Sequence, residues 1–200
     1  MKVIGITGGV GCGKSFIMEY LEQEYNVAVI LTDLVAHELM EIGQKSYHDI
    51  VTHFGTQILK EDGSIDRQIL GAIVFGNKKE LEALNQMTHP NVKEEVKKRI
   101  ANIKQEGKAS MIAVEAALLI EEHYEEICDE LWYIDAKDDV RIKRLIEKRG
   151  YTEEKCHAIM AKQLPRETFL KHCNCVIQND TTKEDAMEQI DKIMREKRII

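Results

Sequence analysis

A short glycine-rich run near the amino terminus has the residue types and spacing needed to hold a polyphosphate. It fits the pattern G-x-x-x-x-G-K-[ST], in which glycines let successive main-chain N–H groups turn toward phosphate oxygens. A lysine in this place reaches the outer phosphates, and the hydroxyl that follows it is a suitable Mg²⁺ ligand. We therefore predict a nucleoside triphosphate site with Mg²⁺ at Gly8-Gly9-Val10-Gly11-Cys12-Gly13-Lys14-Ser15.

The dinucleotide-binding pattern G-x-G-x-x-G does not fit the same run. Reading it from Gly11 places Phe16 where the third glycine should stand. The run is therefore predicted to bind a nucleoside triphosphate. Its predicted nucleotide-binding residues in this stretch are Gly8, Gly9, Gly11, Cys12, Gly13, Lys14, Ser15 and Phe16.

Two acidic residues follow apolar runs that resemble buried strands. Asp33 comes shortly after the run 27–31, and Glu115 closes the run 110–114. Ligands of open α/β sheets lie beyond the carboxyl ends of the strands, so both residues are site candidates. Glu115 is placed like the carboxylate that holds Mg²⁺ in P-loop enzymes, with Ser15 as the second metal ligand. The alternatives are a helix N-cap for Asp33 and a surface acid for Glu115.

The elements that must position these residues alternate between strands and helices. Strands are predicted at 2–7, 27–31, 110–114, 131–135 and 175–178. We therefore expect an α/β fold of the P-loop NTPase class, with a five-stranded parallel sheet flanked by helices.

Two segments interrupt this alternation. Residues 44–107 contain no predicted strand, and a long charged helix at 78–104 is expected to be interrupted near His89-Pro90. We predict that 44–107 is a helical acceptor-binding insertion and that the polar helical segment 151–171 is a lid. The nucleotide-binding core would then comprise 1–43, 108–150 and 172–200.

Composition narrows the possible partners. With 28 basic and 35 acidic residues the net charge is −7, whereas nucleic-acid binders are usually basic, so no nucleic-acid partner is expected. No apolar run approaches the roughly 20 residues of a membrane span, and residues 1–20 carry the glycine-rich run instead of a signal peptide. We expect a cytoplasmic protein without a membrane partner. The sequence leaves the oligomeric state open, and we favour a monomer.

An ordered series of motifs resembles the dephospho-coenzyme A kinase family over nearly the whole chain. The series departs from the family pattern at Phe16, Leu31, Ala117 and Asn174, and at Leu31 the first aspartate of D-A-D is missing. The motifs are the run 7–15, like T-G-G-I-G-S-G-K-S; 32–37, like D-A-D-x-x-A-H; 62–67, like D-G-x-L-D-R; Leu84 with His89-Pro90, like L-x-x-x-x-H-P; 118–121, like P-L-L-F-E; and then Arg144-Leu145, Arg149, Gln163 and 176–179.

The resemblance implies ATP-dependent phosphorylation of the ribose 3′-hydroxyl of dephospho-CoA, giving CoA and ADP in the final step of coenzyme A biosynthesis. It implies that Asp33 orients or deprotonates that hydroxyl, and that Lys14 and arginines of the lid region neutralise the transferring phosphoryl group. Among those arginines, Arg144 and Arg149 are favoured over Arg141. The resemblance also places Asn179 near the adenine, and Asp33, Arg67, His89, Leu118 and Leu119 at the acceptor.

Two other functions share part of this pattern. A kinase for another small acceptor, such as a nucleoside monophosphate or shikimate, would have the same phosphate-binding run and lid. A nucleotide-switch protein would carry the base-reading motif N-K-x-D, which Asn77-Lys78-Lys79-Glu80 approaches only superficially.

Overall fold

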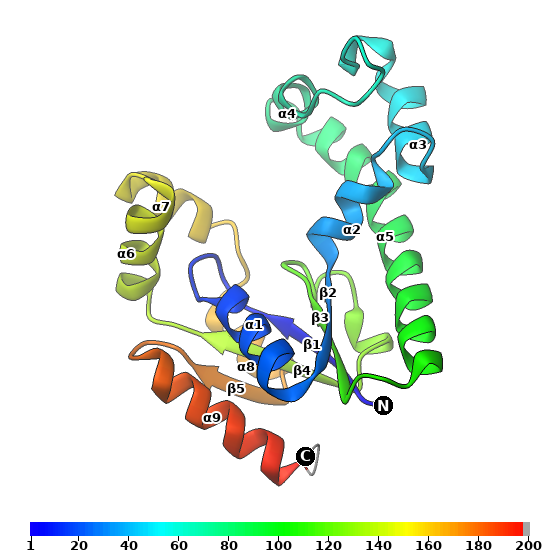
Figure 1. The fold of residues 1–200 in the computed structure, drawn as a ribbon. Coiled ribbons are helices and arrows are strands. Elements are labelled where there is room, and N and C mark those ends of the chain that lie inside the picture. Colours follow the sequence, from blue (N-terminus) through cyan, green and yellow to red (C-terminus); the bar gives the residue numbers. More distant parts are fainter. Residues whose placement is uncertain (198–200) are drawn as a thin grey trace. The chain divides into compact units, whose positions relative to one another are not determined.

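The computed structural model describes residues 1–197, which divide into two compact units (Figure 1). One unit comprises residues 1–30 and the described residues from 102 onward, and the other comprises Leu31–Ala101. The predicted division into core, insertion and lid is a functional one and stays a prediction. The last three residues of the predicted core, 198–200, lie outside the described part of the chain.

A five-stranded parallel sheet forms the centre of the first unit, as predicted. The strands are β1 (Val3–Thr7), β2 (Val27–Leu31), β3 (Met111–Glu115), β4 (Glu130–Asp135) and β5 (Cys175–Gln178), in the spatial order β2-β3-β1-β4-β5. In the register, Val3 lies opposite Ile112, and Trp132 lies opposite Cys175. β1 is buried along its whole length and β4 along nearly all of it, which is why both read as continuous apolar runs.

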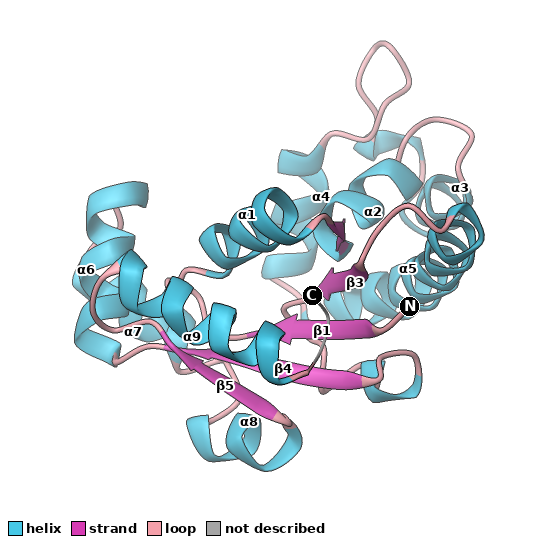
Figure 2. Ribbon diagram, turned by 60° about the horizontal axis from the view of Figure 1, so that its bottom comes forward, coloured by secondary structure: helices cyan, strands magenta, loops and turns pink. Residues whose placement is uncertain are grey.

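Helices cover both faces of this sheet. α1 (Lys14–Tyr25) and α9 (Lys183–Glu196) lie on one face, and α8 (Arg166–His172) lies on the other (Figure 2). Asp191 of α9 accepts hydrogen bonds from Tyr20 Oη at 2.7 Å and Tyr25 Oη at 2.6 Å, which fixes α9 to α1. The remaining helical elements of this unit are η2 (Tyr124–Glu126), α6 (Asp138–Arg149) and α7 (Glu153–Met160).

The second unit is almost entirely helical, as expected for the segment without predicted strands. Its elements are α2 (Thr32–Leu39), α3 (Lys45–Phe54), η1 (Thr56–Ile58), α4 (Arg67–Phe75) and most of α5 (Lys78–Glu106). Its core includes Ile50, Phe54, Ile58, Leu70 and Val74. A single antiparallel bridge between Leu59 and Ile65 closes the turn before α4.

The expected interruption of the long helix at Pro90 is wrong, because α5 runs without a break from Lys78 to Glu106. A proline inside a helix removes the bond to the carbonyl four residues earlier and crowds that carbonyl. Neighbouring side chains add bonds along this stretch: Thr88 Oγ1 donates to the Leu84 carbonyl at 2.9 Å, and Asn91 Nδ2 donates to the Met87 carbonyl at 2.8 Å. Burial of Thr88, Asn91 and Val92 holds the helix through the proline.

Candidate active site

The glycine-rich run forms the loop between β1 and α1 and leads directly into the first turn of the helix. Gly13 is the N-cap residue, with φ 93° and ψ 23°, a left-handed conformation that glycine adopts without strain. It offers no side chain to cap the helix, so the first-turn N–H groups of α1 and its positive dipole end face the loop. Lys14 and Ser15 are the first two residues of that turn.

The carbonyl groups of this loop are held by the protein itself. Lys14 Nζ donates to the Gly8 carbonyl at 2.8 Å, and Asn179 Nδ2 donates to the Cys12 carbonyl at 2.8 Å. Arg144 Nη1 makes a longer contact of 3.4 Å with the same Cys12 carbonyl. Bonds on the carbonyl side fix the conformation in which the loop's N–H groups can receive phosphate oxygens.

Glu115 closes β3 beside the loop, as its place in the sequence predicted. Its carboxylate lies 3.6 Å from Lys14 Nζ, and both side chains are only 16% exposed, so the alternative of a surface acid does not describe this residue. The described residues contain no group of three or more His, Cys, Asp or Glu side chains that could hold a metal ion. Protein Mg²⁺ sites in kinases typically provide one or two oxygen ligands and leave the rest to phosphate and water, which Ser15 and Glu115 fit.

Asn179 and the two predicted arginines differ in how they meet the loop. Asn179 is buried, and besides its bond to Cys12 its main-chain N–H donates to the Asp135 carbonyl at 2.8 Å. Arg144 is half-buried and reaches Cys12. Arg149 lies exposed in the last turn of α6, and within residues 1–197 no hydrogen bond or ion pair joins it to the loop.

Cys12 and Phe16 complete the predicted nucleotide residues. The Cys12 side chain is buried, and this burial raises the pKa of its thiol. Cys12 therefore offers its main chain to a ligand, not a reactive thiolate. The Phe16 ring stacks on Tyr20 at 6.4 Å between centroids, with Lys183 Nζ 5.0 Å from the Phe16 centroid.

The predicted acceptor residues Asp33, Arg67 and His89 belong to the second unit. Asp33 is exposed in the first turn of α2, whose N-cap is Leu31, so the alternative that Asp33 is the N-cap is wrong. Arg67 is exposed at the first position of α4, beside a cavity of about 560 Å³ that is also lined by His37 and Lys60. His89 is half-buried in α5.

Leu118 and Leu119, also predicted at the acceptor, lie in the first unit and differ in exposure. Leu118 is 41% exposed, whereas Leu119 is fully buried. A Cβ added to Gly5 would come within 2.7 Å of Leu119 Cδ1, so Leu119 packs directly on β1. Leu119 can therefore influence a pocket only indirectly, through its packing against the residues around it.

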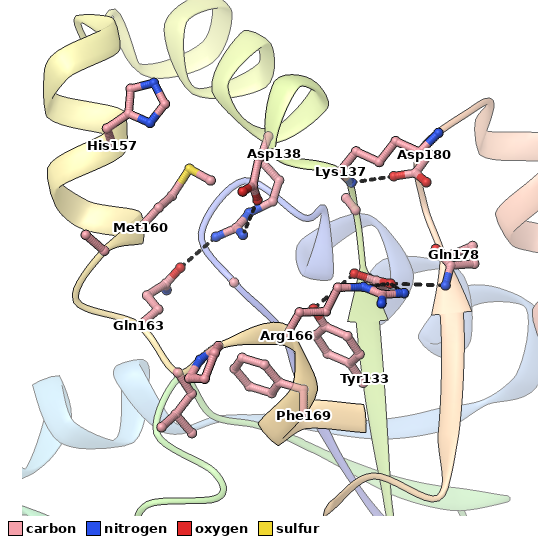
Figure 3. A pocket seen from close by; sticks show the side chains of 17 residues that line it. Tyr133, Lys137, Asp138, His157, Met160, Gln163, Arg166, Phe169, Gln178 and Asp180 are labelled. Atoms are coloured by element: carbon pink, nitrogen blue, oxygen red, sulfur yellow. Dashed lines mark hydrogen bonds and ion pairs between the residues drawn. The ribbon is translucent and has the colours of Figure 1, made fainter. Parts of the chain in front are cut away.

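A cavity of about 870 Å³ is lined by Gly9 and by a buried carboxylate that was not among the predicted site residues. Figure 3 shows this cavity with Tyr133, Arg166 and Gln178 among its lining residues. Asp135, at the end of β4, accepts from Arg166 Nε at 2.8 Å, Arg166 Nη2 at 2.6 Å, Gln178 Nε2 at 3.1 Å and Tyr133 Oη at 3.0 Å. Burial alone would raise the pKa of Asp135, but these donors outweigh it and lower the pKa. The signal that selected Glu115, an acid closing a core strand, applies equally to Asp135.

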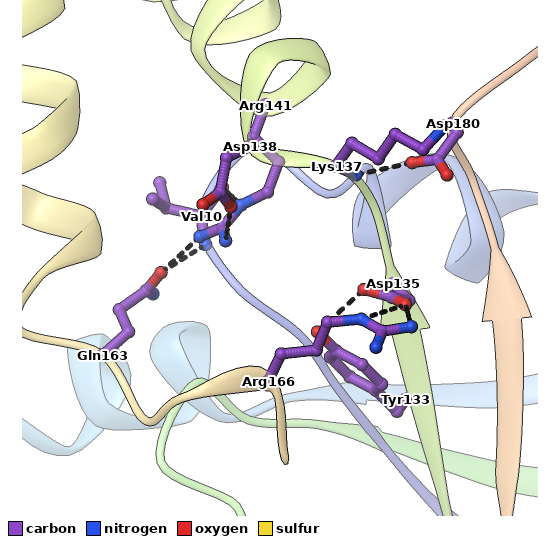
Figure 4. A network of polar contacts seen from close by, with 9 residues as sticks. All are labelled: Val10, Tyr133, Asp135, Lys137, Asp138, Arg141, Gln163, Arg166 and Asp180. Carbon is purple, nitrogen blue, oxygen red and sulfur yellow. Dashed lines mark hydrogen bonds and ion pairs between the residues drawn. The ribbon is translucent and has the colours of Figure 1, made fainter. Parts of the chain in front are cut away.

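Arg141 and Gln163 are two further contacts of the loop; Arg141 was predicted only as a less favoured candidate, and Gln163 was not among the predicted site residues. Arg141 Nε donates to the Val10 carbonyl at 2.9 Å, and Gln163 Oε1 accepts from the Val10 N–H at 3.0 Å (Figure 4). A basic residue on α6 was expected near the loop, but Arg144 was favoured. Nothing in the spacing of the sequence brings Gln163 to Val10, since 153 positions separate them.

The strand order, the loop and the acid closing β3 are those of the P-loop NTPase class. The family described as dephospho-CoA kinase (CoaE) matches residues 2–185 of the chain. The dephospho-CoA kinase of Carboxydothermus hydrogenoformans is 35% identical over 195 residues, which are 98% of this chain and 94% of the relative. The chain belongs to the dephospho-CoA kinase family, whose enzymes carry out the final step of coenzyme A biosynthesis.

Solved structures agree with this assignment. Dephospho-CoA kinase from Campylobacter jejuni superposes with a TM-score of 0.73 at 27% identity, covering 98% of this chain and 97% of that one. A shikimate kinase from Bacteroides thetaiotaomicron reaches a TM-score of 0.54 at 14% identity, covering 98% of each chain, and shows the shared fold alone. No helix among the described residues is long and apolar enough to cross a membrane.

Proposed function

We propose that the chain transfers the γ-phosphoryl group of ATP to the ribose 3′-hydroxyl of dephospho-CoA through the residues described above. The main-chain N–H groups of the loop bind the triphosphate, and Lys14 neutralises charge on its outer phosphates. Ser15 and Glu115 would hold Mg²⁺, which supplies further charge neutralisation when bound. The 3.6 Å approach of Lys14 to Glu115 is the observation that carries this proposal, because it puts both groups at one loop.

Asp33 is the proposed partner of the acceptor hydroxyl. A carboxylate is a weak base, so we propose that Asp33 contributes more by orienting the hydroxyl than by removing its proton. Arg67 and His89 would bind the acceptor. Arg67 lines its cavity together with His37 and Lys60 and with the carboxylates of Glu41 and Asp66.

Phosphoryl transfer passes through a loose transition state, so the chain's contribution is positioning and charge stabilisation more than covalent chemistry. Arg144 and Arg149 are the proposed arginines, and Arg144 already contacts the loop. The segment 151–171 would close over the reactants and exclude water. ATP hydrolysis without acceptor should therefore be slow. We further propose that the enzyme works in the cytoplasm as a monomer, without membrane or nucleic-acid partner.

Replacing Asp33 tests the acceptor side of this proposal. Asp33→Asn should lower kcat about 100-fold while the Kd for ATP, measured by calorimetry, changes little. Lys14→Ala should instead weaken ATP binding as well as turnover. Asp139→Asn, the same exchange at an exposed residue of α6, is the matched control. Wild-type turnover by Asp33→Asn would remove Asp33 from the mechanism.

A further inference from the structure

One side-chain oxygen, Gln163 Oε1, joins the segment after α7 to the phosphate-binding loop. It accepts from the main-chain N–H of Val10 at 3.0 Å and from Arg141 Nη2 at 2.7 Å (Figure 4). Both distances are those of good hydrogen bonds. A single neutral oxygen thus receives one loop N–H and one guanidinium N–H, the two kinds of donor that a phosphate oxygen accepts in such sites.

These bonds fix the plane of the Arg141 guanidinium. Nε donates to the Val10 carbonyl at 2.9 Å, Nη2 to Gln163, and Nη1 to Asp138 Oδ1 at 3.1 Å. A guanidinium has five N–H bonds in a rigid, planar fork. Because each of its three nitrogens donates one hydrogen bond here, its orientation is fixed, and two N–H bonds remain for another acceptor. The Arg141 side chain is only 13% exposed, whereas Asp138 is 74% exposed, and an ion pair that exposed neutralises the charge weakly.

The sequence of the loop leaves room for this guanidinium. Gly9 does not have a positive φ, so backbone conformation does not require glycine there. A Cβ at Gly9 would instead lie 2.2 Å from Arg141 Nη2 and 2.6 Å from Arg141 Cζ. A side chain at position 9 would therefore force the Arg141 guanidinium to move, so Gly9 leaves room for the observed position of Arg141. This observation is independent of the Gln163 bonds.

The amide of Gln163 also suits a site for anions. A carboxylate in its place would accept the same two bonds, but it would neutralise Arg141 and add negative charge beside the triphosphate. A neutral acceptor holds Arg141 and leaves its positive charge for the phosphates.

We propose that Gln163 is a positioning residue for phosphoryl transfer, which holds Arg141 against Gly9 and Val10 so that its free N–H bonds meet the transferring phosphoryl group. This inference rests on the proposed function. It assigns a charge-stabilising role to Arg141, the arginine that the sequence favoured less, and it gives the segment after α7 a defined contact on the loop.

The test is a double-mutant cycle between Gln163 and Arg141 with Mg²⁺, ATP and dephospho-CoA. Gln163→Leu removes the acceptor and should lower kcat by about 10- to 100-fold with little change in the KM for ATP. Arg141→Ala should lower kcat at least as much, and adding Gln163→Leu to it should cost less than about twofold more, because Gln163 acts through Arg141. Gln23→Leu, the same exchange on the exposed face of α1, should behave as wild type.

The isosteric variant Gln163→Glu separates positioning from a merely structural bond. It keeps both hydrogen bonds and should keep the melting temperature, but it should weaken ATP binding about 10-fold in calorimetry, more at low salt than at high salt. Wild-type kcat in Gln163→Leu would overturn the inference. The same would follow if Gln163→Leu lowered kcat as strongly in the Arg141→Ala background as in the wild type. Unchanged ATP affinity in Gln163→Glu would also overturn it. If the wild-type protein transferred no phosphate to dephospho-CoA, that result would count against the proposed function. The ATP affinity of Gln163→Glu, measured by calorimetry, would still test the inference about Gln163.

Discussion

At the scale of single residues, the loop depends on donors that reach its carbonyl groups from distant parts of the sequence. Asn179 is the most buried of them, and its Nδ2 is used on the Cys12 carbonyl. A Cβ at Gly13 would come within 2.3 Å of the same Nδ2, so the loop and Asn179 are closely fitted. The expected place of Asn179 near the adenine is a proposal, whereas its bracing of the loop is seen directly.

Exchanging this amide for a carboxylate should damage both stability and ATP binding. In Asn179→Asp an anionic oxygen faces the Cys12 carbonyl, and the lost donor should cost about 1 to 3 kcal/mol in the free energy of unfolding. The Kd for ATP should rise at least about 10-fold by repulsion. Asn174→Asp is the matched control, because Asn174 uses Oδ1 as an acceptor for the Leu131 N–H at 2.7 Å and a carboxylate preserves that bond. Equal effects of the two exchanges in urea unfolding and calorimetry would contradict this assignment.

At the scale of elements, the strands and most helices could be predicted from the sequence because burial leaves a simple pattern. The runs that became β1, β3 and β4 are apolar on both faces of a parallel sheet. Pro90 was misjudged because the local rule for proline ignores the packing of α5, which outweighs one missing bond. Asp135 closes a core strand as Glu115 does, so the same local pattern marks it as a candidate. Gln163 differs, because its partner Val10 is 153 positions away and no local pattern encodes such a pair.

One residue of the motif at 62–67 stabilises the start of a helix. Asp66 is the N-cap of α4, and its Oδ1 accepts from the Gln68 N–H at 2.9 Å and the Ile69 N–H at 3.2 Å. Asp66→Ala should lower the free energy of unfolding by about 1 kcal/mol, and Asp66→Asn should lose much less, because asparagine also caps helices well. Chemical denaturation of the two variants checks this. An Asp66→Ala protein as stable as wild type would mean that the cap contributes nothing.

At the scale of the whole molecule, one carboxylate links the beginning and the end of the described chain to the sheet. Glu130 in β4 accepts from Lys2 Nζ at 3.0 Å, Lys197 Nζ at 2.5 Å and Trp132 Nε1 at 3.2 Å. Its side chain is 16% exposed. Burial alone would raise the pKa of Glu130, but these donors together lower it to about 2.

This lowered pKa predicts how stability depends on pH. A carboxyl with a folded pKa near 2 and an unfolded pKa near 4.3 stabilises the fold above about pH 4.3, and the contribution is lost as the pH falls toward 2. Glu130→Gln should therefore lower the free energy of unfolding by up to about 3 kcal/mol at pH 7 and by clearly less at pH 3. Urea unfolding at both pH values measures the difference. A gap between wild type and Glu130→Gln that is the same at pH 3 as at pH 7 would contradict the assignment.

Identification of the product shows whether this chain moves a phosphoryl group from ATP to one particular hydroxyl of dephospho-CoA. Wild-type protein would be incubated with Mg²⁺, ATP labelled at the γ-phosphate and dephospho-CoA, and the labelled product located by mass spectrometry and ³¹P NMR. We expect ADP and a coenzyme A labelled only at the ribose 3′ position. Label released as inorganic phosphate, or attached at any other position, would contradict it.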